Sequence, residues 1–154
     1  MKTTIAMLVM LATVLTVECQ QKPKAPFTLV IRAEHTTVKA GEPVVIDVVK
    51  TNTSGHTMNV SQSNNPAENY SMDVKRDGVE AEKTTDAKKM ENANGHRAMS
   101  ILFDNLKAGK VMNETVEVSA YRDMSEPGTY TVRLEQKVGS TVVVASNTIT
   151  VIVE

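Results

Sequence analysis

The chain contains no tryptophan, and its aromatic residues amount to three tyrosines and two phenylalanines among 154 residues. Sugar-binding modules and binders of single-stranded nucleic acid usually stack their ligands on aromatic rings, so this scarcity disfavours both classes. A surplus of one charge sign is also missing, because 17 lysines and arginines offset 18 aspartates and glutamates. A net charge of −1 provides no electrostatic footprint for nucleic acid or for an anionic membrane.

Cysteine is nearly absent as well. Cys19 is the single cysteine of the sequence, so no disulfide can form within the chain. A folded domain must therefore be stabilised by its hydrophobic core. The remaining length of about 135 residues suffices for this, since a chain of that size buries roughly two-thirds of its unfolded surface. One domain is the expected number.

The first residues have the pattern of an export signal. Lys2 provides a positive start, Ile5 to Val17 is an almost uninterrupted apolar run, and the sequence becomes abruptly polar after Cys19. The run is too short to span a bilayer comfortably and has no period that would suggest a buried strand or helix. We therefore expect a signal peptide over residues 1–19, a polar tether over 20–26 and one domain over 27–154.

Two fates of Cys19 remain open. Small or apolar residues precede a cut after Cys19, which would release the domain outside the cytoplasm, either secreted or periplasmic. Alternatively, Leu15 to Cys19 distantly resembles a bacterial lipobox, although Glu18 stands where a small residue is usual. A lipidated Cys19 would anchor the domain to a membrane.

Beyond the tether, apolar and polar residues alternate with a period of two, as in half-buried β-strands. The alternating segments are Phe27–Ala33, Met58–Val60, Tyr70–Val74, Met99–Phe103, Val116–Ala120, Tyr130–Leu134 and Val142–Val153. Val44–Thr51 is β-branched on both faces, as expected of a strand in the middle of a sheet. Turn signals separate them, among them Asp77-Gly78, which is typical of a tight hairpin. The pattern predicts an all-β, immunoglobulin-like antiparallel β-sandwich of about seven or eight strands.

The segment around Tyr130 supports this fold. Pro127 and Gly128 form a turn signal, and Tyr130 and Val132 follow on one face of the next strand. This spacing matches the tyrosine corner of immunoglobulin-like sandwiches, in which a buried tyrosine hydroxyl binds the backbone upstream. Val132 occupies the position where antibody domains carry a cysteine.

The stretch from Glu80 to Met99 interrupts the alternation and is polar with charges of both signs. Thr85 is a candidate cap for a helical turn through Met90, and Asn94-Gly95 is a candidate end. A long excursion from a compact sandwich is either a functional loop or an insertion without a partner, and the sequence leaves both readings open.

Residues able to bind a metal are present but scattered. The three histidines are His35, His56 and His96. His56 and Met58 have a spacing that would suit copper if both lay on one strand face. Further ligands would have to come from His96, Met72, Met90 and Met99, whose spacing does not force them together. Methionine is also a common filler of cores, so we expect Met58 and Met72 to point inward and the domain to hold no metal or cofactor.

No catalytic constellation is evident either. The sequence has no Gly-x-Ser-x-Gly motif, and no cysteine lies in the domain. The carboxylate pairs Glu80/Glu82 and Glu114/Glu117 fall in polar segments, where we expect them to be solvated. His96 and Asp104 would meet only by chance of folding. We therefore expect a protein without enzymatic activity.

Four tripeptides fit the N-glycosylation pattern, and their asparagines are Asn52, Asn59, Asn69 and Asn113. Because asparagine is common at turns, we interpret them as turn residues.

Several phrases resemble bacterial extracytoplasmic immunoglobulin-like domains. They are Lys39–Val44 with Lys50–Ser54, Leu106–Lys110, and Pro127–Val132 with Ser146–Val151. Their order is similar to that of the bacterial intracellular proteinase inhibitor family, although the tryptophan-bearing central segment of that family has no counterpart here. The resemblance implies an immunoglobulin-like sandwich and, as one alternative, inhibition of a proteinase.

Together these observations predict an exported binding module that recognises a still unknown protein at the cell envelope. Recognition would use either the loop at Glu80–Met99 or pairing at a strand edge. The alternatives are a proteinase inhibitor and a copper-binding periplasmic domain. Nucleic acid is not expected as a partner, and a membrane only through lipidation of Cys19.

Overall fold

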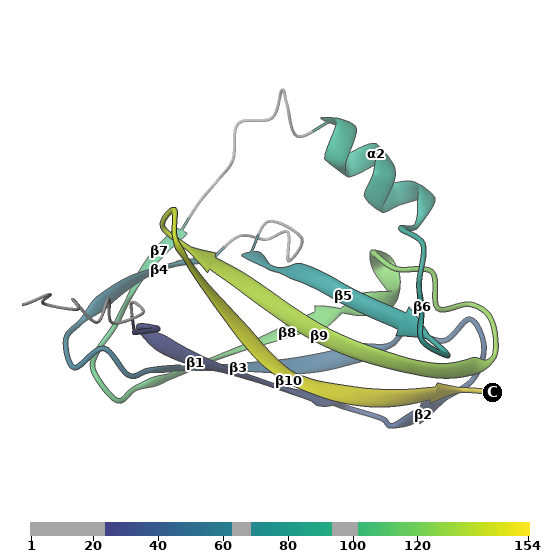
Figure 1. Cartoon of the computed structure of the whole chain (residues 1–154), viewed down its shortest axis with the longest axis horizontal. Coiled ribbons are helices and arrows are strands. Elements are labelled where there is room, and N and C mark those ends of the chain that lie inside the picture. The colour runs from purple at the N-terminus through teal and green to yellow at the C-terminus, as the bar shows by residue number, and fades with distance from the viewer. Residues whose placement is uncertain (1–23, 63–68, 94–101) are drawn as a thin grey trace, which may run out of the picture.

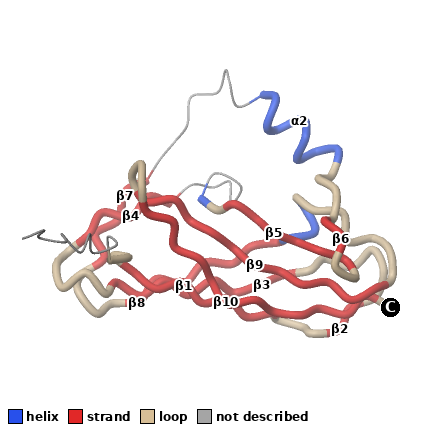
Figure 2. Tube along the Cα trace, in the orientation of Figure 1, coloured by secondary structure: helices blue, strands red, loops and turns tan. Residues whose placement is uncertain are grey.

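The computed structural model of the chain describes residues 24–62, 69–93 and 102–154. The predicted signal peptide over 1–19, Cys19 and the first part of the tether lie outside the described residues. In the described part of the chain, no helix is long and apolar enough to cross a membrane. The described residues form ten strands, one α-helix and one short 3-10 helix, arranged as two packed sheets with the helix to one side (Figures 1 and 2).

Two sheets make up the body of the domain. The smaller has the strand order β1 (Phe27–Ala33), β3 (Val45–Asn52), β8 (Val111–Glu117). The larger has the order β2 (Thr37–Val38), β10 (Val142–Val153), β9 (Gly128–Val138), β5 (Ser71–Arg76), β6 (Val79–Glu80). A separate two-stranded ribbon pairs β4 (Met58–Gln62) with β7 (Leu102–Leu106). Apart from β2, which runs parallel to β10, the paired strands are antiparallel.

This arrangement confirms the predicted all-β, immunoglobulin-like sandwich. The strand count exceeds the predicted seven or eight, partly because β2 and β6 have only two residues each. A pattern of alternation needs several residues to be visible, so such short strands escape it. The prediction of a strand through Ala120 was wrong: β8 ends at Glu117, and Val118–Ala120 forms the 3-10 helix η2. The predicted strand from Met99 begins, in its described part, at Leu102.

The interior is filled by inward-facing aliphatic side chains from both sheets. Its fully buried members include Ile31, Ile46, Val48, Val74, Val116, Val132, Leu134 and Val151. Val132, at the cysteine position of antibody domains, is completely buried, so apolar packing replaces the covalent link there.

Tyr130 confirms the predicted tyrosine corner. Its side chain is 1% exposed, and its hydroxyl donates a hydrogen bond of 2.9 Å to the carbonyl of Glu126. The bond fixes the turn that leads into β9 to the strand that follows it.

The predicted hairpin at Asp77-Gly78 is also confirmed. Arg76 pairs with Val79 across it, and both turn residues have positive φ, 48° at Asp77 and 86° at Gly78. These are the conformations of a type I′ turn, whose twist matches that of the flanking strands.

One side of the sandwich is closed by an asparagine. The register of β9 and β10 shifts between Ala145 and Thr148, and Asn147 lies in this irregularity. Its Oδ1 accepts a bond of 2.8 Å from the amide of Ile31, and its Nδ2 donates one of 3.0 Å to the Ile31 carbonyl. A side-chain amide thus takes the place of a paired strand along β1 and joins the two sheets.

Candidate interaction surface

The candidate metal ligands weighed in the sequence do not come together within the described residues. His35 and His56 are exposed, whereas Met58 packs against the core and Met72 belongs to it. The inward position of Met58 and Met72 confirms the sequence-based expectation. Met90 is exposed, and His96 and Met99 lie outside the described residues. Within those residues, no cluster of three or more histidines, cysteines or acidic residues could hold a metal ion.

The carboxylates predicted to be solvated divide into two groups. Glu80, Glu82 and Glu117 are exposed, as expected. Glu114 is half-buried on the inner face of β8, and its Oε2 accepts a short bond of 2.5 Å from the hydroxyl of Tyr70. The prediction of a solvated Glu114 was therefore wrong. Asp104 is exposed, and its suggested partner His96 is not among the described residues.

Asn52, at the end of β3, has the turn role predicted for it, whereas the same prediction was wrong for Asn59 and Asn113, which lie within β4 and β8. Asn52 is buried, its Oδ1 accepts the amide of Ser54 at 2.9 Å, and its Nδ2 donates to the carbonyls of His56 and Leu106 at 2.8 and 2.7 Å. These bonds hold the end of β3 to the ribbon of β4 and β7, and they leave Asn52 inaccessible to modification.

The excursion after β6 carries the helix α2 (Thr85–Ala93). Thr84 precedes it, and its Oγ1 accepts a bond of 3.1 Å from the amide of Ala87, the arrangement of an N-cap. The same hydroxyl donates at 2.7 Å to the carbonyl of Ala120 in η2. The prediction of a helix here is confirmed, but the capping residue is Thr84 and Thr85 is exposed.

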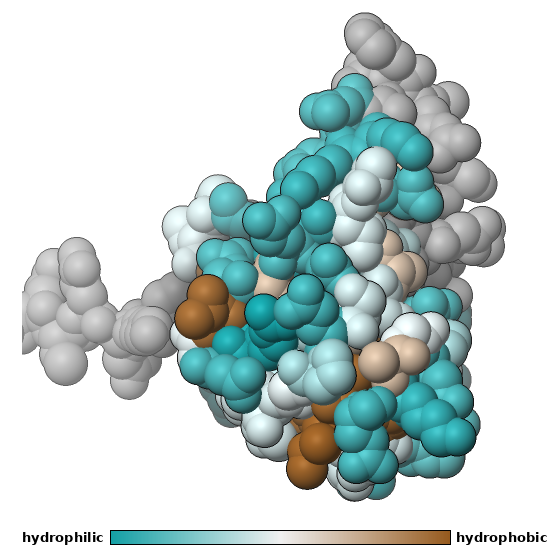
Figure 3. Space-filling view, turned by 90° about the vertical axis from the view of Figure 1, so that its right-hand side faces the viewer, coloured by the Kyte–Doolittle hydropathy of each residue, from teal (hydrophilic) through white to brown (hydrophobic). Residues whose placement is uncertain are grey.

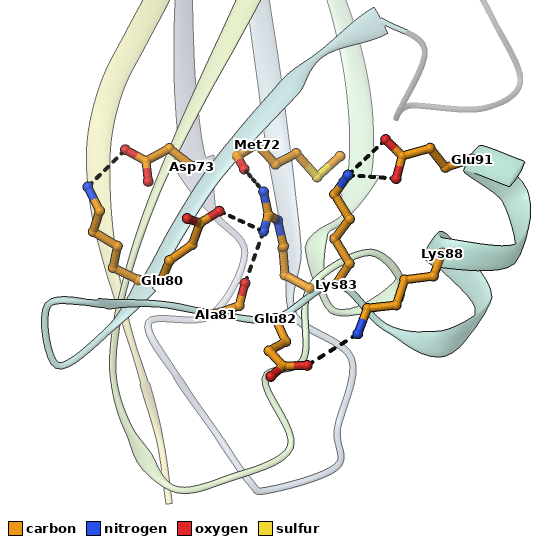
Figure 4. A network of polar contacts seen from close by, with 10 residues as sticks. Met72, Asp73, Glu80, Ala81, Glu82, Lys83, Lys88 and Glu91 are labelled. Atoms are coloured by element: carbon orange, nitrogen blue, oxygen red, sulfur yellow. Dashed lines mark hydrogen bonds and ion pairs between the residues drawn. The ribbon is translucent and has the colours of Figure 1, made fainter.

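Arg122 joins the root of α2 to the larger sheet through contacts with Met72, Ala81 and Glu80, which are labelled in Figure 4. Its Nη2 donates at 2.7 Å to the carbonyl of Met72, and its Nη1 donates at 2.9 Å to the carbonyl of Ala81. Nη1 also pairs with the carboxylate of Glu80 at 3.1 Å. The arginine side chain is only 13% exposed, so these charge-assisted bonds are shielded from water and tie three chain segments together.

Ion pairs continue this attachment along the helix. Lys83 contacts Glu91 at 2.7 Å, and Lys88 contacts Glu82 at 3.2 Å. Both link α2 to the segment before it, as Figure 4 shows. They are exposed, so each contributes little on its own.

Beyond its root, α2 is largely free of the sandwich. Ala87 is its only buried residue among those whose side chains are described, and the helix stands away from both sheets (Figure 1). The exposed residues are Thr85, Asp86, Lys88, Lys89, Met90, Glu91 and Asn92. An α-helix of this length is marginal in water by itself, so the contacts at its root stabilise it.

The carboxyl-terminal end of β8 lies near the root of α2. It leads into η2, and the amide of Thr84 donates at 3.1 Å to the carbonyl of Tyr121, just beyond η2. Among the described strands, β8 pairs with β3 alone. Its outward side chains, Val111, Asn113, Thr115 and Glu117, are all exposed.

The surface seen from the end of the molecule nearest the carboxyl terminus is mostly polar, with small separate apolar spots (Figure 3). The large apolar side chains that are exposed in the described residues come from scattered elements: Val30, Val79, Met90, Val111, Val143 and Ile152. A partner that binds this surface would therefore gain more from polar and backbone contacts than from a hydrophobic patch.

Lys50 is a feature that the sequence analysis missed. It is 1% exposed in the middle of the inner face of β3, with its Nζ 5.3 Å from the ring centre of Phe27 and 5.5 Å from that of Tyr70. Burial lowers the pKa of Lys50, and the charge of Glu114 partly offsets this. Burial, followed by the bond to Glu114, raises the pKa of Tyr70. Ile46, Val48 and Lys50 are alternate residues of β3 and therefore share one face of the strand. This spacing was the signal in the sequence that could have placed Lys50 in the interior.

The fold and this surface define an immunoglobulin-like domain with an attached polar helix. No family model matches the chain, and no curated protein matches it. Among solved structures, it is similar to a β-glucosidase from Erythrobacter marinus, with a TM-score of 0.44 and 12% identity. That match covers 83% of this chain but 15% of the glucosidase, and a likeness this weak carries no functional argument.

Proposed function

We propose that the chain is an exported, non-enzymatic immunoglobulin-like module that binds a protein partner at the cell envelope. Export is inferred from the apolar leader over residues 1–19. Binding is inferred from the side of the sandwich that carries α2. Inhibition of a proteinase and binding of copper stay predictions from the sequence, since no described feature favours either.

The observation that carries the proposal is the attachment of α2. The shielded Arg122, the cap at Thr84 and the bond to Ala120 hold the root of a helix that buries almost nothing itself. Folding must still overcome the entropy of ordering this helix. A fixed polar helix is a means of presenting side chains to a partner, as loops on rigid scaffolds commonly do.

The test is site-specific photo-crosslinking in an envelope extract. A photoreactive amino acid is placed at Lys89 on α2, at Thr115 on β8, or at Lys39 on the turn after β2 as the control; all three positions are exposed. We expect a discrete protein adduct from Lys89, from Thr115 or from both, and none from Lys39. Adducts that are equal at all three positions, or absent from Lys89 and Thr115, would overturn the proposal.

A further inference from the structure

Among the described strands, β8 has a partner on one edge only, and its register shows which of its backbone groups lie on the other edge. Val45 pairs with Glu117 and Thr51 with Val111 in one continuous ladder. Just beyond its two ends, the amide of Val118 donates to Val44 at 2.8 Å, and the amide of Asn52 donates to Lys110 at 3.0 Å. Even-numbered residues of this segment therefore bond toward β3.

In an antiparallel ladder the bonded positions alternate. The odd-numbered residues of β8 consequently direct their N–H and C=O groups away from β3: Val111, Asn113, Thr115 and Glu117. The same alternation applies to β1. There the backbone N–H and C=O of the odd-numbered Ile31 point away from β3 and form hydrogen bonds with the side chain of Asn147. On β8, no described residue occupies the equivalent place.

Two other strand edges, those of β1 and β5, are covered. Asn147 covers β1, and Arg122 together with the segment after β6 covers the free side of β5, where it bonds the Met72 carbonyl. Exposed edges are usually blunted by lysine, proline or a bulge. The segment Val111–Glu117 contains no lysine or proline, and its register has no bulge.

The charge of β8 selects the kind of strand that fits. The segment carries Glu114 and Glu117 and no cation. Oε2 of Glu114 accepts a hydrogen bond from the hydroxyl of Tyr70. A second copy of this chain, paired through β8, would bring four carboxylates together, and like charges across strands are destabilising.

We propose that β8 accepts an extended, cationic segment of the partner protein as a fourth strand of the smaller sheet. This inference rests on the proposed binding function and names its mode. The backbone groups of the four odd-numbered residues supply the hydrogen bonds, and lysine or arginine on the incoming strand pairs with Glu117 on the outer face or Glu114 on the inner face. Threonine and valine suit its remaining positions.

The experiment selects ligands from a phage-displayed library of random peptides, with the full chain as the target. Selected peptides are then synthesised and titrated against Thr115→Pro and Thr115→Val. Proline removes one outward N–H without touching the ladder to β3, and valine keeps that N–H with nearly the same side-chain shape. We expect basic, β-branched peptides whose affinity falls at least tenfold for proline and stays within about twofold for valine.

Two further measurements keep the test independent of folding of the proline variant. Amide hydrogen exchange of the unaltered chain should slow at Asn113, Thr115 and Glu117 when a selected peptide is bound. Glu117→Lys should weaken these peptides at least tenfold at low salt, and less at high salt.

The inference is overturned if no peptide is enriched, if enriched peptides bind Thr115→Pro and Thr115→Val alike, or if exchange at the odd-numbered amides is unchanged. A dimer of the free chain that forms through β8 would overturn it as well. Because the crosslinking from Lys89 on α2 does not depend on β8, failure of this mode is distinguishable from failure of the binding function.

Discussion

Lys50 places a cation in an interior whose other inward side chains are mostly apolar. Removal of an ammonium from water is costly, and the faces of two aromatic rings recover part of that cost. The bond from Tyr70 to Glu114 also joins the two sheets beside it. Strand alternation reveals that residue 50 faces inward, but only the fold shows which side chains surround it.

Replacement of Lys50 by methionine tests whether this buried charge limits stability. Burial keeps the folded-state pKa of Lys50 below its usual value of 10.5. At pH values between these two pKa values, Lys50 is therefore more protonated in the unfolded chain than in the folded chain. The free energy of unfolding therefore rises with pH between the folded-state pKa of Lys50 and 10.5. Lys50→Met should abolish this rise and leave the protein at neutral pH as stable as before, or about 1–2 kcal/mol more stable.

Urea unfolding between pH 7 and about pH 10 measures the effect. The raised pKa of Tyr70 acts in the opposite sense: its contribution is complete below pH 10.0 and is lost above it, so both proteins should lose stability at higher pH. Lys110→Met, at an exposed position, is the control and should retain the wild-type slope. Equal slopes in Lys50→Met and wild type would contradict the prediction.

At the scale of the element, α2 shows that local sequence predicts a helix but does not fix the residue that caps it. Thr84 and Thr85 are adjacent and chemically identical, so the sequence alone cannot distinguish which of them caps the helix. The fold makes the choice, because Thr84 is the residue that also reaches the carbonyl of Ala120.

Thr84→Ala and Thr85→Ala therefore form a matched pair. Loss of the Thr84 hydroxyl removes a cap and leaves the Ala120 carbonyl without this donor, so we expect a loss of about 1–2 kcal/mol in the free energy of unfolding. Thr85→Ala should change it by less than about 0.5 kcal/mol. Thermal and urea unfolding provide the comparison, and equal effects of the two substitutions would disprove the assignment of the cap.

Arg122→Lys tests the root of the helix in another way. Lysine keeps the charge but cannot reach the carbonyls of Met72 and Ala81 with a planar fork. Two shielded carbonyls lose their donor, for an expected loss of about 2–4 kcal/mol. Arg133→Lys, on the half-exposed surface of β9, should be close to neutral.

Hydrogen exchange separates a local from a global effect of Arg122→Lys. We expect the amides of α2 to lose protection more than those of β9, because the arginine bonds the segment just before the helix. An even loss of protection over both elements would show that Arg122 stabilises the whole sandwich and does not specifically position α2.

The strands illustrate how far pattern reading extends. The first and last strands, Phe27–Ala33 and Val142–Val153, were predicted with the bounds that the structure has, because their alternation is long. The hairpin at Asp77-Gly78 was predictable because only a few residues tolerate its positive φ values. By contrast, the covering of β5 by Arg122 depends on contacts between residues distant in sequence, and no local pattern encodes them.

At the scale of the whole molecule, the two sides of the sandwich differ in whether the edge strand is covered. On one side, Asn147 joins β1 to β10 and closes the gap between the sheets. On the other, β8 pairs with no further described strand. Open edges favour unwanted association, so the contrast between the covered β1 and the uncovered β8 agrees with β8 as a place for a partner strand.

Asn147→Asp tests this division. The carboxylate keeps an acceptor for the amide of Ile31 but removes the donor to the Ile31 carbonyl and places a negative charge beside it. We expect a loss of about 2–3 kcal/mol in the free energy of unfolding, and faster amide exchange along β1. Because the edge of β1 is then uncovered, self-association should also increase, which sedimentation velocity at rising protein concentration would detect.

Asn105→Asp adds the same charge at an exposed position of β7 and should remain monomeric and stable to within about 0.5 kcal/mol. If Asn147→Asp behaves like Asn105→Asp, the asparagine does not close the sandwich, and the contrast between its two sides no longer supports β8 as the open edge.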